Sequence, residues 1–131
     1  MSVLTQEIQG YLSSVKRGEA GELSMTLAFP PEFSGFRGHF PGRPVLPGVC
    51  MVQTALVALG ATHQTTIRLR RLVAAKWMAP VLPGEELGFT LRVKEGESGA
   101  SRVKVVVTRA SEKIAEFSIE VTGMPKGAGG S

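Results

Sequence analysis

The chain has 131 residues, 43% of them hydrophobic and 20% charged, which suits one globular domain with its own core. The formal net charge of +4 favours acidic partners, but one Trp and one Tyr are too few for a base-stacking surface and no nucleic-acid-binding motif is present. Cys50 is the only cysteine, which excludes an internal disulfide and fits a reducing compartment.

The N-terminal segment, residues 1–20, is predicted as a helix. Ser2 is a candidate cap, and apolar side chains follow at helical spacing: Leu4, Ile8, Tyr11, Leu12 and Val15. This segment has no apolar core of the signal-peptide kind. The longest apolar run, 45–61, is interrupted by proline and polar residues and is short for a membrane span. We therefore expect a soluble, cytoplasmic protein that contacts neither membrane nor nucleic acid.

Residues 23–29 predict a first strand, because apolar side chains alternate with polar or small ones until two prolines follow. The stretch 32–47 is rich in Gly and Pro yet carries large apolar side chains, which is typical of a shaped loop rather than a linker. A helix from residue 48 to about residue 61 comes next. It is apolar around nearly its whole circumference, so it should be enclosed.

The rest of the chain predicts strands. One has imperfect alternation and three alternate cleanly: 67–77, 87–93, 103–107 and 115–121. Short turns at 96–99 and 110–113 make consecutive strands antiparallel. An antiparallel sheet must then wrap the apolar helix to bury it. We predict an α+β fold in a single domain, 1–131, with the Gly-rich stretch 123–131 as a flexible tail.

The segment 38–49 contains the residues that predict a catalytic site. Three prolines, at positions 41, 44 and 47, restrict the backbone, so His39 is expected on a stiff loop. Gly48 follows at the start of the predicted helix, where unpaired N–H groups favour negative charge. An imidazole beside such an N–H suits enolate chemistry. The ring removes a proton next to a carbonyl, and the N–H stabilises the oxygen that gains charge.

Two stretches of the chain resemble one known family. His39–Val49, HFPGRPVLPGV, resembles the active-site signature of bacterial 3-hydroxyacyl-[acyl-carrier-protein] dehydratases of the FabA/FabZ type, and 75–87, AKWMAPVLPGEEL, resembles a downstream segment of that family. The resemblance implies a hot-dog fold, in which an antiparallel sheet wraps one long helix, and a dimer with two acyl tunnels at the subunit interface. It implies a 3-hydroxyacyl thioester of acyl carrier protein or CoA as the substrate. His39 would match the catalytic histidine and Gly48 the glycine whose N–H binds the thioester carbonyl.

Position 53 departs from that family. The family has Glu or Asp five residues after the helix-start glycine, supplied by the other subunit, whereas this chain has Gln53. Glutamine forms hydrogen bonds but transfers no proton near neutral pH, and losing a general acid or base costs about 100- to 10,000-fold in rate. Three interpretations stay open. The protein is a dehydratase in which His39 makes both proton transfers and Gln53 orients the hydroxyl, an acyl thioesterase, or an inactive partner subunit of a hot-dog heterodimer.

The remaining predictions concern the acyl pocket, the carrier and the assembly. Four residues are expected to line the substrate pocket: Phe40, Pro47, Val49 and Trp77. Three arginines are expected to dock an acidic carrier, with an ordinary solvated strand edge as the alternative: Arg37, Arg43 and Arg70. No metal or cofactor is predicted, because the two histidines and one cysteine lack ligand spacing and no G-x-G-x-x-G motif is present. A homodimer is expected, with a hexamer or a heterodimer as alternatives.

Overall fold

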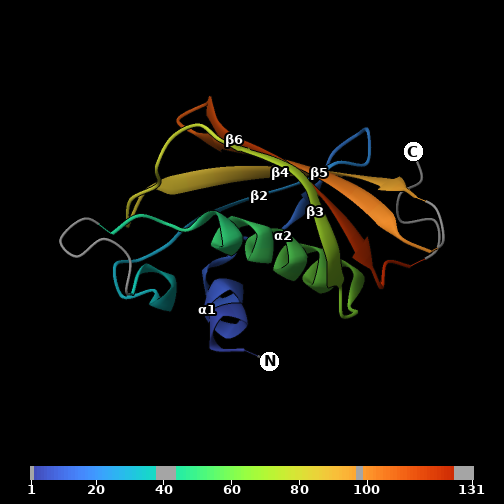
Figure 1. Cartoon of the computed structure of the whole chain (residues 1–131), viewed down its shortest axis with the longest axis horizontal. Helices are drawn as coiled ribbons and strands as arrows, with labels where there is room; N and C mark the ends of the chain where they lie inside the picture. Colours follow the sequence, from blue (N-terminus) through green and yellow to red (C-terminus); the bar gives the residue numbers. More distant parts are fainter. Residues whose placement is uncertain (1, 38–43, 97–98, 126–131) are drawn as a thin grey trace.

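A computed structural model gives the fold, and it describes residues 2–37, 44–96 and 99–125. The predicted tail, 123–131, lies outside this part from residue 126 onward. Figure 1 shows three layers: a curved sheet, the helix α2 against one of its faces, and the helix α1 on the far side of α2. In chain order the elements are α1 (Val3–Tyr11), β1 (Lys16–Arg17), β2 (Leu23–Ala28), the short 3-10 helix η1 (Ser34–Phe36), α2 (Gly48–His63), β3 (Arg68–Trp77), β4 (Glu86–Glu95), β5 (Ser101–Arg109) and β6 (Glu112–Thr122).

The strands form one antiparallel sheet in the order β1-β2-β4-β5-β6-β3. The predicted period of two is confirmed on β4, β5 and β6, where buried side chains alternate with more exposed ones. The turn before β6 is shorter than predicted, because Ala110 and Ser111 adopt positive φ values of 51° and 69° and close the hairpin in two residues. Glu112 and Lys113, predicted in that turn, belong to β6.

The helix α2 is enclosed as predicted, except at its first turn. From Cys50 to Leu59 most of its side chains are buried. Val49, by contrast, is 71% exposed, so the N-terminal end of the helix is open on one side. The helix ends at His63, slightly beyond the prediction, because Gln64 takes the left-handed conformation with φ 54°. Within the described ranges, no helix has the length and apolar character needed to cross a membrane.

The N-terminal helix is shorter than predicted. It covers only Val3–Tyr11, with Ser2 as its cap. The chain then leaves the helix to pair with β2: the Ser13 N–H donates to the Thr26 carbonyl, and the Ser13 hydroxyl accepts the Thr26 N–H. Lys16–Arg17 extend as β1 instead of continuing a helix to residue 20, because strand pairing with β2 satisfies their backbone.

An aromatic cluster holds the first half of the predicted loop against α1. Tyr11 meets the rings of Phe29 and Phe33 edge-on, with centroids 6.2 and 5.9 Å away, and Phe33 meets Phe36 at 5.8 Å. Phe29 and Phe33 are fully buried. The prediction of a shaped loop rather than a linker is thus confirmed for residues 32–37.

The edge strand β3 is exposed along nearly its whole length. Three of its apolar side chains pair with buried positions of β6 yet remain uncovered: Leu69 is 44%, Leu72 47% and Trp77 44% exposed. The register against β6 shifts twice, between Leu69 and Arg71 and between Leu72 and Ala74. Such bulges explain the imperfect alternation of the sequence here, since each inserts a residue into the period of two.

Candidate active site

The start of α2 and the end of β3 meet at the candidate site. A Cβ atom placed on Gly48 would lie 2.7 Å from two carbons of the Trp77 indole, so the ring covers the glycine closely. Trp77 also contacts Phe117, with ring centroids 5.5 Å apart. Only glycine fits under the indole without displacing it. Gly48 and Trp77, two predicted site residues that are distant in the sequence, are therefore neighbours in the fold.

The first turn of α2 offers backbone N–H donors beside that indole. Pro47 precedes the helix and its ring has no hydrogen-bond acceptor, so no side chain caps this end. The first turn also has no acidic residue. The Leu46 N–H donates to the Val81 carbonyl at 2.8 Å, which anchors the approach to the helix on the β3–β4 connection. This electropositive helix end is suited to an oxygen that carries partial negative charge.

The structure describes only some of the predicted site residues. Pro47 and Val49 flank Gly48 in the chain, and Val49 is exposed. Three predicted residues lie outside the described residues: His39, Phe40 and Arg43. Their roles remain predictions from the sequence.

Gln53 connects α2 to α1. Its side-chain amide donates to the Thr5 hydroxyl at 2.9 Å, and the side chain is half-buried. The Thr5 hydroxyl lies 2.9 Å from that of Ser2, so the connection continues to the cap of α1. Sequence reasoning missed this contact, because the two residues are 48 positions apart.

Glu7 is a polar residue near this region that sequence reasoning missed. One carboxylate oxygen accepts the Ser34 N–H at 3.1 Å and the Tyr11 hydroxyl at 3.4 Å. Hydrogen bonding from Ser34 holds the pKa of Glu7 below its usual range, although burial acts in the opposite direction. The other oxygen, Oε1, is buried and has no hydrogen-bond partner among the described residues. A signal existed, since Glu7 shares a helical face with Leu4 and Tyr11, where an apolar residue is expected.

Cys50 is a core residue although it lies in the first turn of α2. It is 3% exposed, and burial raises the pKa of its thiol to about 11, with the charge of Glu7 adding to the effect. The thiolate, which is the reactive form, is therefore scarce near neutral pH. In the described ranges, no group of three or more His, Cys, Asp or Glu side chains is arranged to hold a metal ion.

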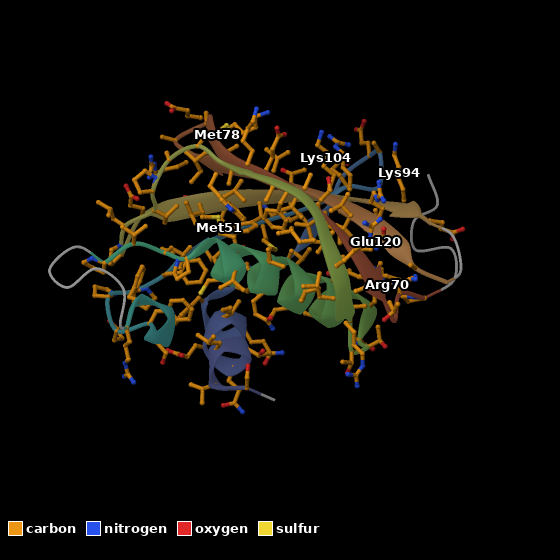
Figure 2. All side chains as sticks on the ribbon, viewed as in Figure 1. Met51, Arg70, Met78, Lys94, Lys104 and Glu120 are labelled. Atoms are coloured by element: carbon orange, nitrogen blue, oxygen red, sulfur yellow. The ribbon has the colours of Figure 1, made fainter. Side chains whose placement is uncertain are left out.

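The two described docking arginines lie apart. Arg37 is exposed at the end of η1. Arg70 lies near the other end of β3 from Trp77, about 23 Å away at roughly 3.3 Å per residue. Figure 2 shows Arg70 and Lys94 towards the same end of the molecule. The structure therefore does not bring Arg70 next to Gly48.

The sheet and its central helix define the fold class, which is the predicted hot-dog fold. The dehydratase heterocomplex ApeI:P from Xenorhabdus doucetiae matches with a TM-score of 0.67 and 18% identity over 85% of this chain and 96% of that chain. The HP0420 homologue from Helicobacter felis matches with a TM-score of 0.64 and 18% identity over 87% and 89% of the two chains. The F36A mutant of the fluoroacetyl-CoA-specific thioesterase FlK matches with a TM-score of 0.63 and 14% identity over 86% and 90%. At these identities the likeness establishes the fold alone.

The sequence narrows this class to one family. Residues 15–118 match the family model ApeI-like, described as ApeI dehydratase, and the chain belongs to this family. It is 36% identical to "3-hydroxyacyl-[acyl-carrier-protein] dehydratase FabZ" of Bartonella quintana over 92 residues, which cover 64% of this chain and 59% of that protein. It is 33% identical to the FabZ of Polynucleobacter asymbioticus over 100 residues, covering 71% and 67%. The chain thus spans about 59% of the Bartonella relative's length. The predicted resemblance to dehydratases of this type is confirmed.

Proposed function

We propose that the protein removes water from a 3-hydroxyacyl thioester, carried by acyl carrier protein or CoA, to give the enoyl thioester. The observation that carries this proposal is the junction between the His39–Val49 signature and α2, where Gly48 begins the helix directly under Trp77. Membership of a family described as a dehydratase supports the same reaction.

His39 acts as the base and then as the acid. Its imidazole takes the proton from the carbon next to the thioester carbonyl, and the electron pair moves to the carbonyl oxygen. The Gly48 N–H, at the electropositive start of α2, stabilises that oxygen. The pair then returns, the bond from the β-carbon to the hydroxyl breaks, and the imidazolium protonates the leaving group to give water. The proton lost in the first step is thus the one that leaves with the hydroxyl.

In this proposal the Gln53 that orients the leaving hydroxyl comes from the other subunit of the dimer, as the family resemblance implies, and it transfers no proton. Its hydrogen bond to Thr5 restricts the amide, which supports an orienting role. His39 then carries both transfers alone. Because a positioned acid or base contributes about 100- to 10,000-fold, this chain is expected to be slower than one with Glu at position 53.

The proposed active form is a dimer. The uncovered apolar side chains of β3 support it. Three further apolar residues, close in the sequence to Gly48 or Trp77, are also exposed: Val49 is 71%, Met78 42% and Leu82 47% exposed. Pairing two β3 edges would satisfy backbone groups that an isolated edge strand leaves open. A homodimer is the first choice, and the heterocomplex named for the Xenorhabdus structure supports a heterodimer as the alternative. The lone free cysteine supports the cytoplasm as its location.

Gln53 favours one second candidate, acyl thioesterase activity. Hydrolysis adds water to the thioester carbonyl and releases a free thiol, and it requires no acid at the β-hydroxyl. The same N–H of Gly48 would stabilise the oxygen of the carbonyl during attack.

The two activities separate in one experiment. The purified protein is incubated with a 3-hydroxyacyl thioester while enoyl absorbance is followed, and with a saturated acyl thioester while free thiol is followed. We expect enoyl product from wild type, none from His39→Ala, and a rate about tenfold or more higher from Gln53→Glu. Absence of enoyl product from both wild type and Gln53→Glu excludes the dehydratase, and thiol release would then support the thioesterase. Unchanged turnover in His39→Ala excludes the proposed site.

A further inference from the structure

Two pairs of like charges face each other on the outer surface of the sheet. Lys94 of β4 lies directly opposite Arg102 of β5, and Arg92 lies directly opposite Lys104. All four side chains are exposed, and Figure 2 shows Lys94 and Lys104 on the side of the sheet away from α2. Like charges directly opposite each other destabilise a sheet, so these two cation pairs oppose folding in the middle of the sheet.

Acidic residues compensate only part of this charge. Glu120 of β6 accepts a hydrogen bond from Arg102 at 3.2 Å and one from Arg71 at 2.7 Å, so a single carboxylate serves two guanidinium groups. Beside Lys104, β6 carries the uncharged Ser118. The positive charge of Lys104 is among the causes that lower the pKa of Glu116, after the hydrogen bond and the charge of Lys113, so this carboxylate also offsets part of the charge. A net positive surface remains.

One of the two cation pairs, Lys94 with Arg102, lines a hollow of about 760 Å³ between β3 and the end of β4. Its other charged residues are Arg70 and Arg71 of β3 and two carboxylates, Glu95 and Glu120, so cations outnumber carboxylates by four to two. Consecutive residues of a regular strand point to opposite faces, but the register shift between Leu69 and Arg71 inserts Arg70 as an extra residue. The bulge therefore adds a further cation to the same surface.

The arrangement of these cations fits carboxylates on one face of a helix. The four cations of the two pairs are separated by about 5 Å across the strands and about 7 Å along them. Acidic side chains at positions i and i+4 of a helix are about 6 Å apart. The outward positions of β4, β5 and β6 carry no aromatic residue, whereas membrane-surface binding uses apolar anchors and single-stranded nucleic acid binding uses stacking rings.

We propose that the outer face of the sheet, centred on Arg92, Lys94, Arg102 and Lys104, docks an acidic helical segment of a partner protein. This face is turned away from α2, so a partner bound to it leaves the start of that helix uncovered. Docking goes beyond the proposed dehydration and leaves the acyl site free. Binding of carboxylates to this face offsets the repulsion within the two cation pairs.

A fluorescent helical peptide with Glu at i, i+4 spacing tests the proposal, with the Gln version of the same peptide as its control. We expect the Glu peptide to bind and the Gln peptide not to bind, and the affinity for the Glu peptide to fall as the salt concentration rises. The double variant Lys94→Glu, Lys104→Glu should bind it about tenfold or more weakly, because the charge of each pair falls from +2 to 0. The matched variant Lys16→Glu, Arg17→Glu alters the net charge equally on β1 and should bind like wild type.

Melting temperature adds an independent readout. Reversal at positions 94 and 104 converts like-charge pairs to opposite-charge pairs, so the double variant should melt a few degrees above wild type. The variant Lys94→Gln, Lys104→Gln, which removes both lysine charges without adding negative ones, should also lose peptide binding. Equal weakening in the β1 control, or a melting temperature below that of wild type, overturns the proposal. So does equal or tighter binding of anionic phospholipid vesicles or of duplex DNA. Enoyl formation is measured alongside and should be the same in every variant.

Discussion

The contact between Gly48 and Trp77 leaves no space for a side chain at the start of α2. Two carbons of the indole lie 2.7 Å from the place where a Cβ would be. The ring in turn packs on Phe117 of the neighbouring strand, which restricts its movement on that side although 44% of Trp77 is exposed. The distance between the helix start and the end of β3 is therefore set by an indole packed on a glycine.

Gly48→Ala should both destabilise the protein and remove activity. The added methyl group collides with the indole, and overpacking of this kind costs about 1–3 kcal/mol. Displacing Trp77 or the helix start would also move the Gly48 N–H from the thioester oxygen. Urea unfolding and turnover measure the two effects.

Gly10→Ala is the matched control, since a Cβ there meets nothing within 4 Å and the position lies in α1. It should be neutral or stabilising by about 0.5–1 kcal/mol, as for Gly replaced by Ala in a helix. Wild-type stability in Gly48→Ala would show that the indole yields easily. Combining Gly48→Ala with Trp77→Leu should recover part of the lost stability, because the smaller side chain relieves the collision.

The helix α1 connects to two segments that flank the candidate site. Its Thr5 hydroxyl accepts the amide of Gln53 on α2, and its Glu7 carboxylate accepts the backbone N–H of Ser34 in η1. The short helix η1 directly precedes the segment that contains His39 in the sequence. A nine-residue helix thus orders two regions that are far apart in the chain.

Glu7→Gln should lower stability at pH 7 by about 1 kcal/mol, because a hydrogen bond to a charged acceptor is lost or weakened. The sign of the pH dependence follows from the lowered pKa of Glu7 in the folded state. The stabilisation is present above the ordinary carboxyl pKa of 4.5 and is lost as the pH falls through the lower folded value. Urea unfolding of both proteins at pH 7, 5 and 3.5 should therefore show a difference that shrinks with acid. The exposed Glu19→Gln serves as control, and a gap that widens with acid contradicts this role.

At the scale of the whole molecule, the strands of the sheet differ in how much of each is buried. The strands β2, β4, β5 and β6 bury alternate side chains against α2, whereas β3 remains exposed along its length. The side chains of Leu69, Leu72 and Trp77 form an exposed apolar surface on β3. Each of these residues lies opposite a buried residue of β6. Exposed apolar surface of this kind is typical of an interface between subunits.

Leu72→Glu should turn the proposed dimer into a monomer. A carboxylate in an apolar interface loses its hydration without gaining a partner, which opposes association. Leu72 is 47% exposed in the single chain, so the fold of each subunit should persist. Light scattering after size exclusion measures the mass, and circular dichroism checks the fold. Ala74→Glu, on the opposite face of the same strand, is the control and should remain dimeric. An unchanged mass for Leu72→Glu contradicts the proposed interface.

Local pattern was enough to predict most elements of this fold. The strands β4, β5 and β6 were predicted from a period of two, because side chains of a half-buried strand must alternate between core and solvent. The continuous apolarity of α2 predicted that it would be enclosed, and two sequence signatures predicted its family. Gly48 was predicted at the start of the helix and is found there.

Features that depend on partners distant in the chain needed the tertiary structure. The N-terminal helix stops at Tyr11 because Ser13 pairs with Thr26, which no local pattern indicates. Arg70 joins the outer face through a bulge, and the closeness of Trp77 to Gly48 follows from where β3 docks in the sheet. Periodicity and capping act over a few residues, so the sequence alone determines them. Register, bulges and contacts between elements arise only when distant segments compete for the same backbone hydrogen bonds and the same space.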